Sequence, residues 1–248
     1  MNFETRQYGG LTCEVVDSLP RNTSPGLLVM LCHGFGAPGD DLVDFGPMVL
    51  EADEQIASQV RFVFPAAPID LGPMGMPGGR AWWPINMAKL AEINQTQDFS
   101  QLTNMEPPGM KDAGEKLSQC IDAALTDAGL TSSQLVLGGF SQGAMVSTQV
   151  VLTSGLVPRL LVLFSGSLLN REEWERLAAS HPKCPVLQSH GRQDPILPYA
   201  AAVQLRDLLS AQKFPVEFLE FQGPHTIPIP VLQRFAERLL ENESPVGG

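Results

Sequence analysis

Short apolar runs recur along the chain, and each of them ends in Gly, Pro or a polar turn. The runs are Leu27–Cys32, Val60–Phe64, Gln134–Leu137, Leu160–Phe164, Pro185–Leu187 and Val216–Phe221. Most are continuously apolar rather than alternating, which is typical of strands that are buried on both faces. The last run carries Glu217 and Glu220, so we expect it nearer a sheet edge. Tyr8–Leu19 is rich in β-forming residues and predicts an antiparallel edge strand or hairpin.

Segments with helical spacing lie between these runs. The apolar residues of Lys111–Ala128 fall on one stripe, and Tyr199–Ser210 and Val231–Leu240 show similar patterns after a Pro that suits a helix start. Strands that alternate with helices predict an α/β fold with a mostly parallel central sheet and helices on both faces. No internal repeat or low-complexity linker interrupts the pattern, so we expect residues 1–248 to form a single domain.

Residues 65–108 break this alternation. The segment is rich in Gly, Pro and Met, and it holds Trp82 and Trp83 without a clear period. Long irregular segments in compact domains are usually functional or disordered, and two adjacent tryptophans favour packing over disorder. We therefore expect an irregular insertion, about residues 65–108, that lies over the active site.

Charge and cysteine content narrow the function classes. The net charge of −11 argues against nucleic-acid binding, which needs clustered Lys and Arg, and it favours solubility. The cysteines contain no C-x-x-C pair, which excludes the common zinc spacings and favours reduced thiols in the cytosol. They are Cys13, Cys32, Cys120 and Cys184. Met1–Arg6 has no apolar core of a secretory signal, and Leu27–Cys32 is too short for a membrane span, so we expect a cytoplasmic protein.

Gly139-Phe140-Ser141-Gln142-Gly143 has the G-x-S-x-G pattern of a nucleophile elbow. Alone this pattern is weak evidence, but a buried-strand run precedes it and residues with helical spacing follow it. This strand–turn–helix order is the one that the α/β-hydrolase fold requires, and it predicts Ser141 as a nucleophile. In the alternative interpretation, the glycines form an ordinary turn and Ser141 caps a helix.

A serine hydroxyl needs a base that a third group orients, and the fold predicts the chain order Ser, acid, His. His33 precedes Ser141, and His181 lies at a predicted helix end before a proline. His190 ends a strand, and no well-placed acid lies between it and Ser141. His225 follows the last strand run in a loop, and it is therefore the predicted base.

The predicted acid is Asp194, in the loop after the run Pro185–Leu187. The other acidic residues suit the role less, because they lie at a solvated helix start, on a polar helix face or within a strand. They are Glu172, Glu173, Glu175, Asp207, Glu217 and Glu220. An Asp-Pro pair is also a common turn, which is the structural alternative for Asp194.

Backbone amides are the predicted oxyanion donors. One is the amide of Gln142, which follows the nucleophile, and the other is that of Phe35, in the Gly-containing loop after the strand Leu27–Cys32. A plain Gly-rich turn is the alternative for that loop. The candidate substrate-binding residues are Trp82, Trp83, Met74, Met76 and Ile196, for each of which simple packing is an equal alternative.

Four blocks together resemble the phospholipase/carboxylesterase family of α/β-hydrolases, which includes acyl-protein thioesterases. They are His33-Gly34-Phe35-Gly36, the block from Gly138 to Gly143, His190-Gly191-x-x-Asp194-Pro195 and Gly223-Pro224-His225. The resemblance covers roughly Leu27 to Leu240 and implies a Ser-Asp-His carboxylesterase with no metal or cofactor. The segment from Leu71 to Pro108 is longer than in compact members, so the analogy is weakest for substrate choice.

The leading hypothesis is a serine carboxylesterase that hydrolyses short- to medium-chain acyl esters through an acyl-enzyme at Ser141. An acyl-protein thioesterase or lysophospholipase would use the same triad, and a catalytically silent binding protein with this fold is the alternative of another class. The expected partner is a small-molecule acyl ester or thioester, without nucleic acid or stable membrane insertion. The sequence leaves a homodimer open.

Overall fold

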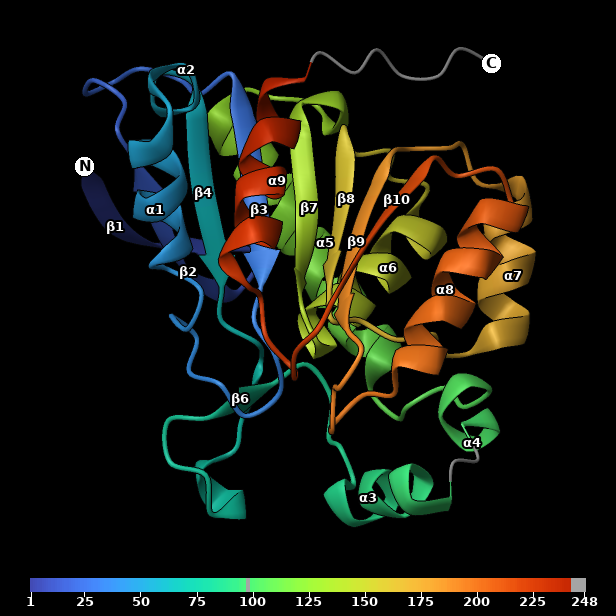
Figure 1. Ribbon diagram of the computed structural model, residues 1–248. Coiled ribbons are helices and arrows are strands. Elements are labelled where there is room, and N and C mark those ends of the chain that lie inside the picture. Colours follow the sequence, from blue (N-terminus) through green and yellow to red (C-terminus); the bar gives the residue numbers. More distant parts are fainter. Residues whose placement is uncertain (97–98, 242–248) are drawn as a thin grey trace.

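The computed structural model describes residues 1–96 and 99–241 (Figure 1). Within these residues, eight strands form the central sheet in the order β1-β2-β4-β3-β7-β8-β9-β10. Their bounds are β1 Asn2–Tyr8, β2 Leu11–Asp17, β3 Leu27–Cys32, β4 Val60–Pro65, β7 Leu135–Phe140, β8 Leu160–Phe164, β9 Val186–Gly191 and β10 Val216–Phe221. The β1–β2 and β2–β4 pairs are antiparallel, and all other neighbours in the sheet are parallel. The predicted mostly parallel sheet is confirmed, with β1–β2 as an antiparallel hairpin at one edge and β10 at the other.

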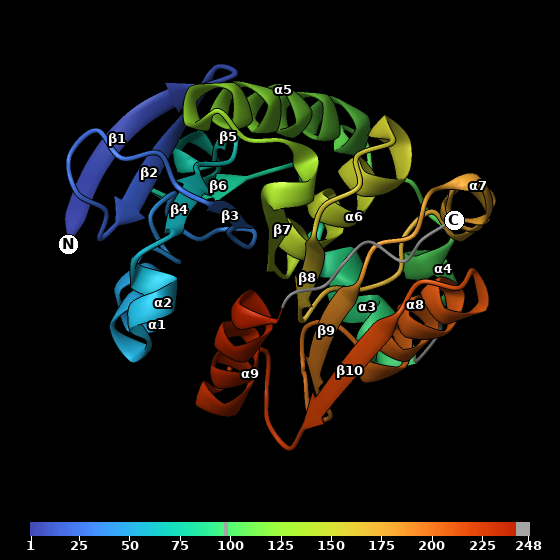
Figure 2. The ribbon, with the colours of Figure 1, turned by 90° about the horizontal axis from the view of Figure 1, so that it is seen from above.

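Helices cover both faces of this sheet, as predicted (Figure 2). On one face lie α1 Phe45–Ala52, α2 Glu54–Ala57 and α9 Ile229–Leu240, and on the other lie α5 Met110–Ala128, α6 Gln142–Ser154, α7 Arg171–Ser180 and α8 Tyr199–Ala211. The three segments with clear helical spacing correspond to α5, α8 and α9. In the described part of the chain, none of the helices combines the length and apolarity that a membrane span needs.

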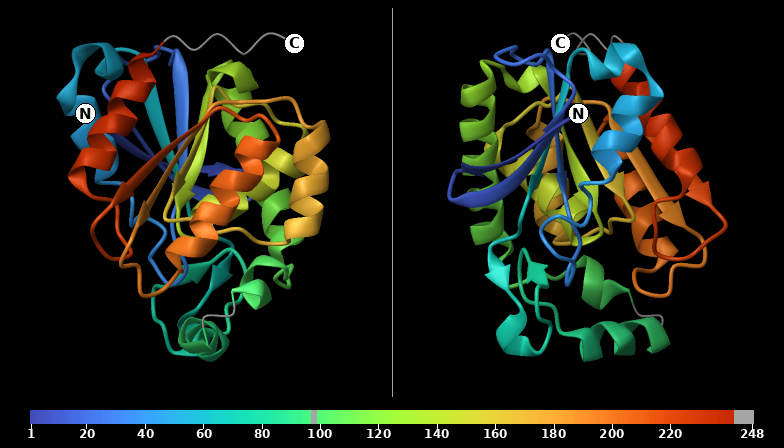
Figure 3. Two further views of the ribbon diagram at one scale, coloured as in Figure 1. Left: turned by 45° about the vertical axis from the view of Figure 1, so that its right-hand side comes forward. Right: turned by 90° about the vertical axis from the view of Figure 1, so that its left-hand side faces the viewer.

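Residues 65–108 contain more regular secondary structure than the sequence predicts. They contain β5 Ile69–Asp70, a 3-10 turn Gly72–Met74, β6 Arg80–Ala81, α3 Met87–Thr96 and α4 Ser100–Thr103, while residues 97–98 lie outside the described residues. Strands of two residues and a helix without a strong apolar stripe leave little periodic signal, which explains the expectation of an irregular segment. This insertion lies beyond the carboxyl ends of the parallel strands (Figure 3).

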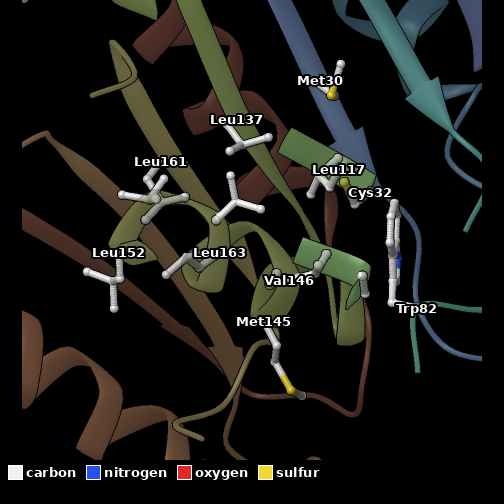
Figure 4. Packing of buried hydrophobic residues seen from close by; sticks show 14 of the residues in the cluster. Met30, Cys32, Trp82, Leu117, Leu137, Met145, Val146, Leu152, Leu161 and Leu163 are labelled. Carbon is white, nitrogen blue, oxygen red and sulfur yellow. The ribbon is translucent and has the colours of Figure 1, made fainter. Parts of the chain in front are cut away.

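The inner strands β3, β7 and β8 are buried on both faces, so their successive residues enter two separate cores. In β3, Leu28, Met30 and Cys32 face one core, and Leu27, Val29 and Leu31 face the other. Figure 4 shows the first core, where Met30 and residues of β7 and β8 lie opposite Leu117 and Val146. This double burial explains why the strands appear in the sequence as continuous apolar runs.

Candidate active site

Ser141 occupies the sharp turn between β7 and α6. Its backbone has φ 56° and ψ −117°, a left-handed conformation that costs a residue other than Gly about 1–3 kcal/mol. The amide of Ser141 donates to the Phe164 carbonyl oxygen at 2.8 Å, which fixes the turn against β8. Ser141 stands at the N-cap position of α6, but its side chain makes no capping hydrogen bond. The helix-cap interpretation therefore does not account for the hydroxyl.

The glycines on either side of Ser141 are needed for a steric reason. A Cβ atom on Gly139 would lie 2.2 Å from the carbonyl oxygen of Cys32, and one on Gly143 would lie 1.9 Å from the same oxygen. Both contacts are with backbone, which cannot swing away. The G-x-S-x-G spacing thus allows the last residue of β3 to pack against both sides of the turn.

Asp194 and His225 meet in the loops that follow β9 and β10. His225 Nδ1 lies 2.6 Å from Asp194 Oδ2, and the two side chains are 8% and 0% exposed. The other carboxylate oxygen, Oδ1, accepts the amides of Ile196 at 2.8 Å and Leu197 at 2.9 Å. Burial by itself would raise the pKa of Asp194, but hydrogen bonds from His190 and His225 outweigh it and hold this pKa well below its usual range. Asp194 is therefore ionised at neutral pH.

Two further contacts place the His225 loop beside the Ser141 turn. The ring of His225 lies 4.6 Å, centroid to centroid, from that of Phe140, the residue before Ser141. The Ser165 hydroxyl, just after β8, donates to the Thr226 carbonyl oxygen at 3.3 Å. Ser141, Asp194 and His225 thus lie at the same end of the sheet, where the parallel strands end.

A sequence model described as Phospholipase/Carboxylesterase matches residues 13–240. The chain belongs to the phospholipase/carboxylesterase family. The match spans all strands from β3 to β10 and the whole insertion, so the resemblance of the four sequence blocks extends to the whole parallel part of the sheet. A comparison with curated proteins gives no sequence match.

Solved structures similar to this family member share its fold. The crystal structure of esterase PE8 has a TM-score of 0.75 and 23% identity, with 97% of this chain and 99% of that chain covered. A carboxylesterase from Mesorhizobium loti has a TM-score of 0.70 and 16% identity, covering 97% and 99% of the two chains. The Bacillus cereus carboxylesterase has a TM-score of 0.66 and 15% identity, covering 92% of each. These similarities confirm the α/β-hydrolase fold.

In this phospholipase/carboxylesterase-family protein, the predicted donor residue Gln142 directly follows Ser141 as the first residue of α6, and Phe35 lies in the loop after β3. A Cβ atom on Gly34 would lie 3.3 Å from the Cβ atom of Ser141, so the loop that carries Phe35 passes directly beside the serine. Among residues 1–96 and 99–241, neither amide donates to another backbone carbonyl. Both donors are therefore available to a bound group.

His33 fixes the shape of the Phe35 loop. Its Nε2 accepts the Ala67 amide at 3.0 Å, so the proton is on Nδ1, which lies 2.8 Å from the Gly34 carbonyl oxygen. Burial lowers the pKa of His33, which agrees with this neutral form. The sequence excluded His33 as the base because it precedes Ser141, but gave no sign of this positioning contact.

The side chain of Gln142 joins the Ser141 turn to the insertion. Its Nε2 donates to the Trp83 carbonyl oxygen at 2.8 Å, and its Oε1 accepts the Trp82 amide at 2.9 Å. The indole Nε1 of Trp82 donates to the His33 carbonyl oxygen at 3.0 Å. The Ser141 turn, the Phe35 loop and the insertion are therefore tied into one unit. Sequence reasoning assigned only the backbone of Gln142 to the site.

An apolar pocket of about 470 Å³ lies between the insertion and α6, and no charged residue is among the described residues that line it. Its walls include Trp83, Leu90, Ile93, Leu102, Met145 and Leu197. Met145 lies one helical turn after Ser141, and the amide of Leu197 binds Asp194. The pocket therefore opens between elements that hold two of the predicted catalytic residues.

Of the five predicted substrate-binding residues, Trp83 lines this pocket. Trp82 is instead packed in the core near Cys32, and Met74 and Ile196 are 63% and 39% exposed (Figure 4). Met76 lies over the Phe35 loop, with its methyl group 3.6 Å from a Cβ atom placed on Gly36. Leu90, Ile93 and Leu102 were not predicted, because α3 and α4 were not expected. Within the described residues, no group of three or more His, Cys, Asp or Glu is arranged to hold a metal ion.

Proposed function

We propose that the protein is a serine carboxylesterase that hydrolyses short- to medium-chain acyl esters through an acyl-enzyme at Ser141. The observation that carries this proposal is the 2.6 Å contact between His225 and the buried Asp194, at the end of the sheet where the Ser141 turn presents its hydroxyl. Nucleophilic acyl transfer needs a base that an ionised acid orients, and a serine whose hydroxyl is not used in a helix-capping hydrogen bond. Membership of the phospholipase/carboxylesterase family supports the same reaction class.

In this mechanism the Nδ1–H group of His225 donates a hydrogen bond to the ionised Asp194, which leaves Nε2 free to accept the proton of Ser141. The Ser141 oxygen then bonds to the ester carbonyl carbon, and the amides of Phe35 and Gln142 stabilise the negative oxygen of the tetrahedral intermediate. The intermediate expels the alcohol, which takes the proton from His225, and leaves an acyl-enzyme. Water, deprotonated by His225, then bonds to the acyl carbon, the bond from that carbon to the Ser141 oxygen breaks, and the serine oxygen takes the proton back from His225 as the carboxylic acid leaves.

The apolar pocket is the proposed site of the acyl chain. Its volume of about 470 Å³ lies within the ~300–1,000 Å³ of small-molecule sites, and apolar walls favour a hydrocarbon chain over a charged acyl group. Because the pocket recognises the acyl side of the substrate, a thioester or a lysophospholipid with the same acyl group is the second candidate. The leaving group then decides between these activities.

The test is hydrolysis of p-nitrophenyl esters of increasing chain length, from acetate to decanoate, with matched acyl thioesters and lysophospholipids as parallel arms. Ser141→Ala should abolish turnover of every substrate while the protein stays folded. Turnover retained in that variant would remove Ser141 from the mechanism. Absence of turnover in the wild-type protein on all arms would favour the silent binding protein.

A variant pair tests the pocket. Ile93→Trp fills the pocket and should move the optimum to shorter chains, whereas Met48→Trp alters an exposed residue on α1 and should leave the optimum unchanged. An unchanged optimum in a folded Ile93→Trp variant would show that the acyl chain lies elsewhere.

A further inference from the structure

Asp194 is contacted by a second histidine that the proposed mechanism does not use. His190 lies in β9, and its side chain is fully buried. Its Nε2 lies 3.2 Å from Asp194 Oδ2, the oxygen that also accepts His225, and 3.0 Å from the Leu197 carbonyl oxygen. Each carboxylate oxygen of Asp194 is thus held from two sides, Oδ1 by two amides and Oδ2 by two imidazoles.

These contacts fix the tautomer of His190. A carbonyl oxygen and an ionised carboxylate can only accept, so the proton is on Nε2, which is bonded to the Leu197 carbonyl oxygen and faces Asp194 Oδ2. Within the described residues, the buried Nδ1 has no hydrogen-bond partner, so a proton on Nδ1 would be a buried donor without an acceptor. His190 therefore turns its Nε2–H edge toward both Leu197 and Asp194.

His190, Leu197 and Asp194 form a closed ring of contacts. The Leu197 amide donates to Asp194, while the Leu197 carbonyl oxygen accepts from His190, which also reaches Asp194. The ring ties the carboxylate to both β9 and its own loop. Because His190 is completely buried, it has no access to substrate.

Resting on the proposed function, we infer that His190 is a positioning residue, which holds the carboxylate of Asp194 in the orientation that His225 needs. The proposal assigns a role to the histidine of the His190-Gly191 block that is distinct from the general base. It predicts that His190 acts on turnover only through the Asp194–His225 pair.

The other ionisable groups around His190 are already engaged with one another. The ring of Tyr199 in α8 lies 6.3 Å from that of His190, centroid to centroid. Glu220 of β10 lies beside His190 of β9 in the strand register, as its backbone neighbour. The carboxylate of Glu220 accepts Arg192 at 2.6 Å and the Tyr199 hydroxyl. Asp194, whose Oδ2 lies 3.2 Å from His190 Nε2, is therefore the carboxylate on which His190 acts.

The matched variants are His190→Phe, which keeps a ring but removes the donor, and His190→Gln, which keeps a donor at similar reach. A hydrogen bond to a charged group contributes enough that its loss should lower kcat about 10- to 100-fold, with KM changed less than about 3-fold. His190→Gln should recover most of kcat. The acidic limb of the kcat/KM profile should move to higher pH in His190→Phe, because Asp194 Oδ2 then has only His225 as a side-chain donor.

A double-mutant cycle distinguishes positioning from a merely structural role. In a His225→Ala background, His190→Phe should lower the residual rate less than about 3-fold, because the pair through which it acts is already broken. Equal losses in both backgrounds, or a folded His190→Phe with wild-type kcat, would overturn the inference. If His190→Phe does not fold, His190→Gln decides, since a loss of more than 10-fold in that variant contradicts the role.

Failure of this inference can be told apart from failure of the proposed function. Labelling of the wild-type protein with a fluorophosphonate tests Ser141 independently of His190. A wild-type protein that labels at Ser141, combined with a fully active His190→Phe, rejects the positioning role and leaves the esterase mechanism intact. A wild-type protein that does not label at Ser141 rejects the mechanism itself.

Discussion

Gln142→Glu should make the stability of the protein depend steeply on pH. The Gln142 carboxamide is fully buried and makes two opposite contacts, donating to Trp83 O and accepting Trp82 N–H. A protonated carboxyl group can make the same two contacts, because its hydroxyl donates and its carbonyl accepts. An ionised carboxylate only accepts, so it would face the Trp83 carbonyl oxygen without a donor.

The size of this pH dependence follows from the difference between the pKa of the introduced carboxyl group in the folded chain and its pKa in the unfolded chain. Burial and the need for a donor raise the pKa of the introduced carboxyl group in the folded state above the ~4.3 of an exposed Glu. The variant should therefore match the wild-type free energy of unfolding below about pH 4.3. Above it, the slope approaches about 1.4 kcal/mol per pH unit until the folded-state pKa is passed, so up to about 2.4 kcal/mol is lost between pH 4.5 and 6.5.

Urea unfolding at a series of pH values, followed by tryptophan fluorescence, measures this dependence. Gln55→Glu, at an exposed position of α2, is the matched control and should follow the wild-type curve throughout. A difference between Gln142→Glu and wild type that does not change from pH 4.5 to 6.5 would refute the two-contact role of Gln142.

Three further predictions concern the acid, the Phe35 loop and the turn. Asp194→Asn should lower kcat about 10⁴-fold with the fold intact by circular dichroism, and a rate above a tenth of wild type would contradict its role. Because burial lowers the pKa of His33, the unfolded chain gains a proton first, and the unfolding free energy should fall as pH drops below about 6.5. His33→Gln should reduce that slope, with the rest coming from His181, whose pKa burial also lowers, and an unchanged slope would exclude a contribution from His33. Gly143→Ala should destabilise the protein by about 3 kcal/mol or more, because its methyl group would meet Cys32 O, whereas Gly26→Ala should be nearly neutral in the same urea titration.

The sheet could be predicted because burial on both faces gives a direct sequence signal. Leu27–Cys32, Leu160–Phe164 and Val216–Phe221 have the same bounds in the sequence prediction and in the structure. Helix α1 gave no prediction, since its first turn contains Gly46 and Pro47. The order of the strands in the sheet depends on pairings between distant segments, which no local pattern encodes.

The order of residues along the chain and their positions in loops were enough to select Asp194 and His225 as candidate site residues. Both place Asp194 and His225 in loops after neighbouring strands, and the structure brings them to 2.6 Å. The contact of His190 with the same carboxylate was not predictable, because the order of residues along the chain served only to exclude His190 as base. The pocket residues Ile93 and Leu102 were missed because they belong to short helices of the insertion, which are defined by packing more than by periodicity.

The most direct test of the esterase mechanism is to map the site of a fluorophosphonate adduct by mass spectrometry. We expect one adduct per chain, on the hydroxyl of Ser141, with no adduct in Ser141→Ala and much slower labelling in His225→Ala. An adduct on a different residue, or a Ser141→Ala variant that still labels, would contradict it.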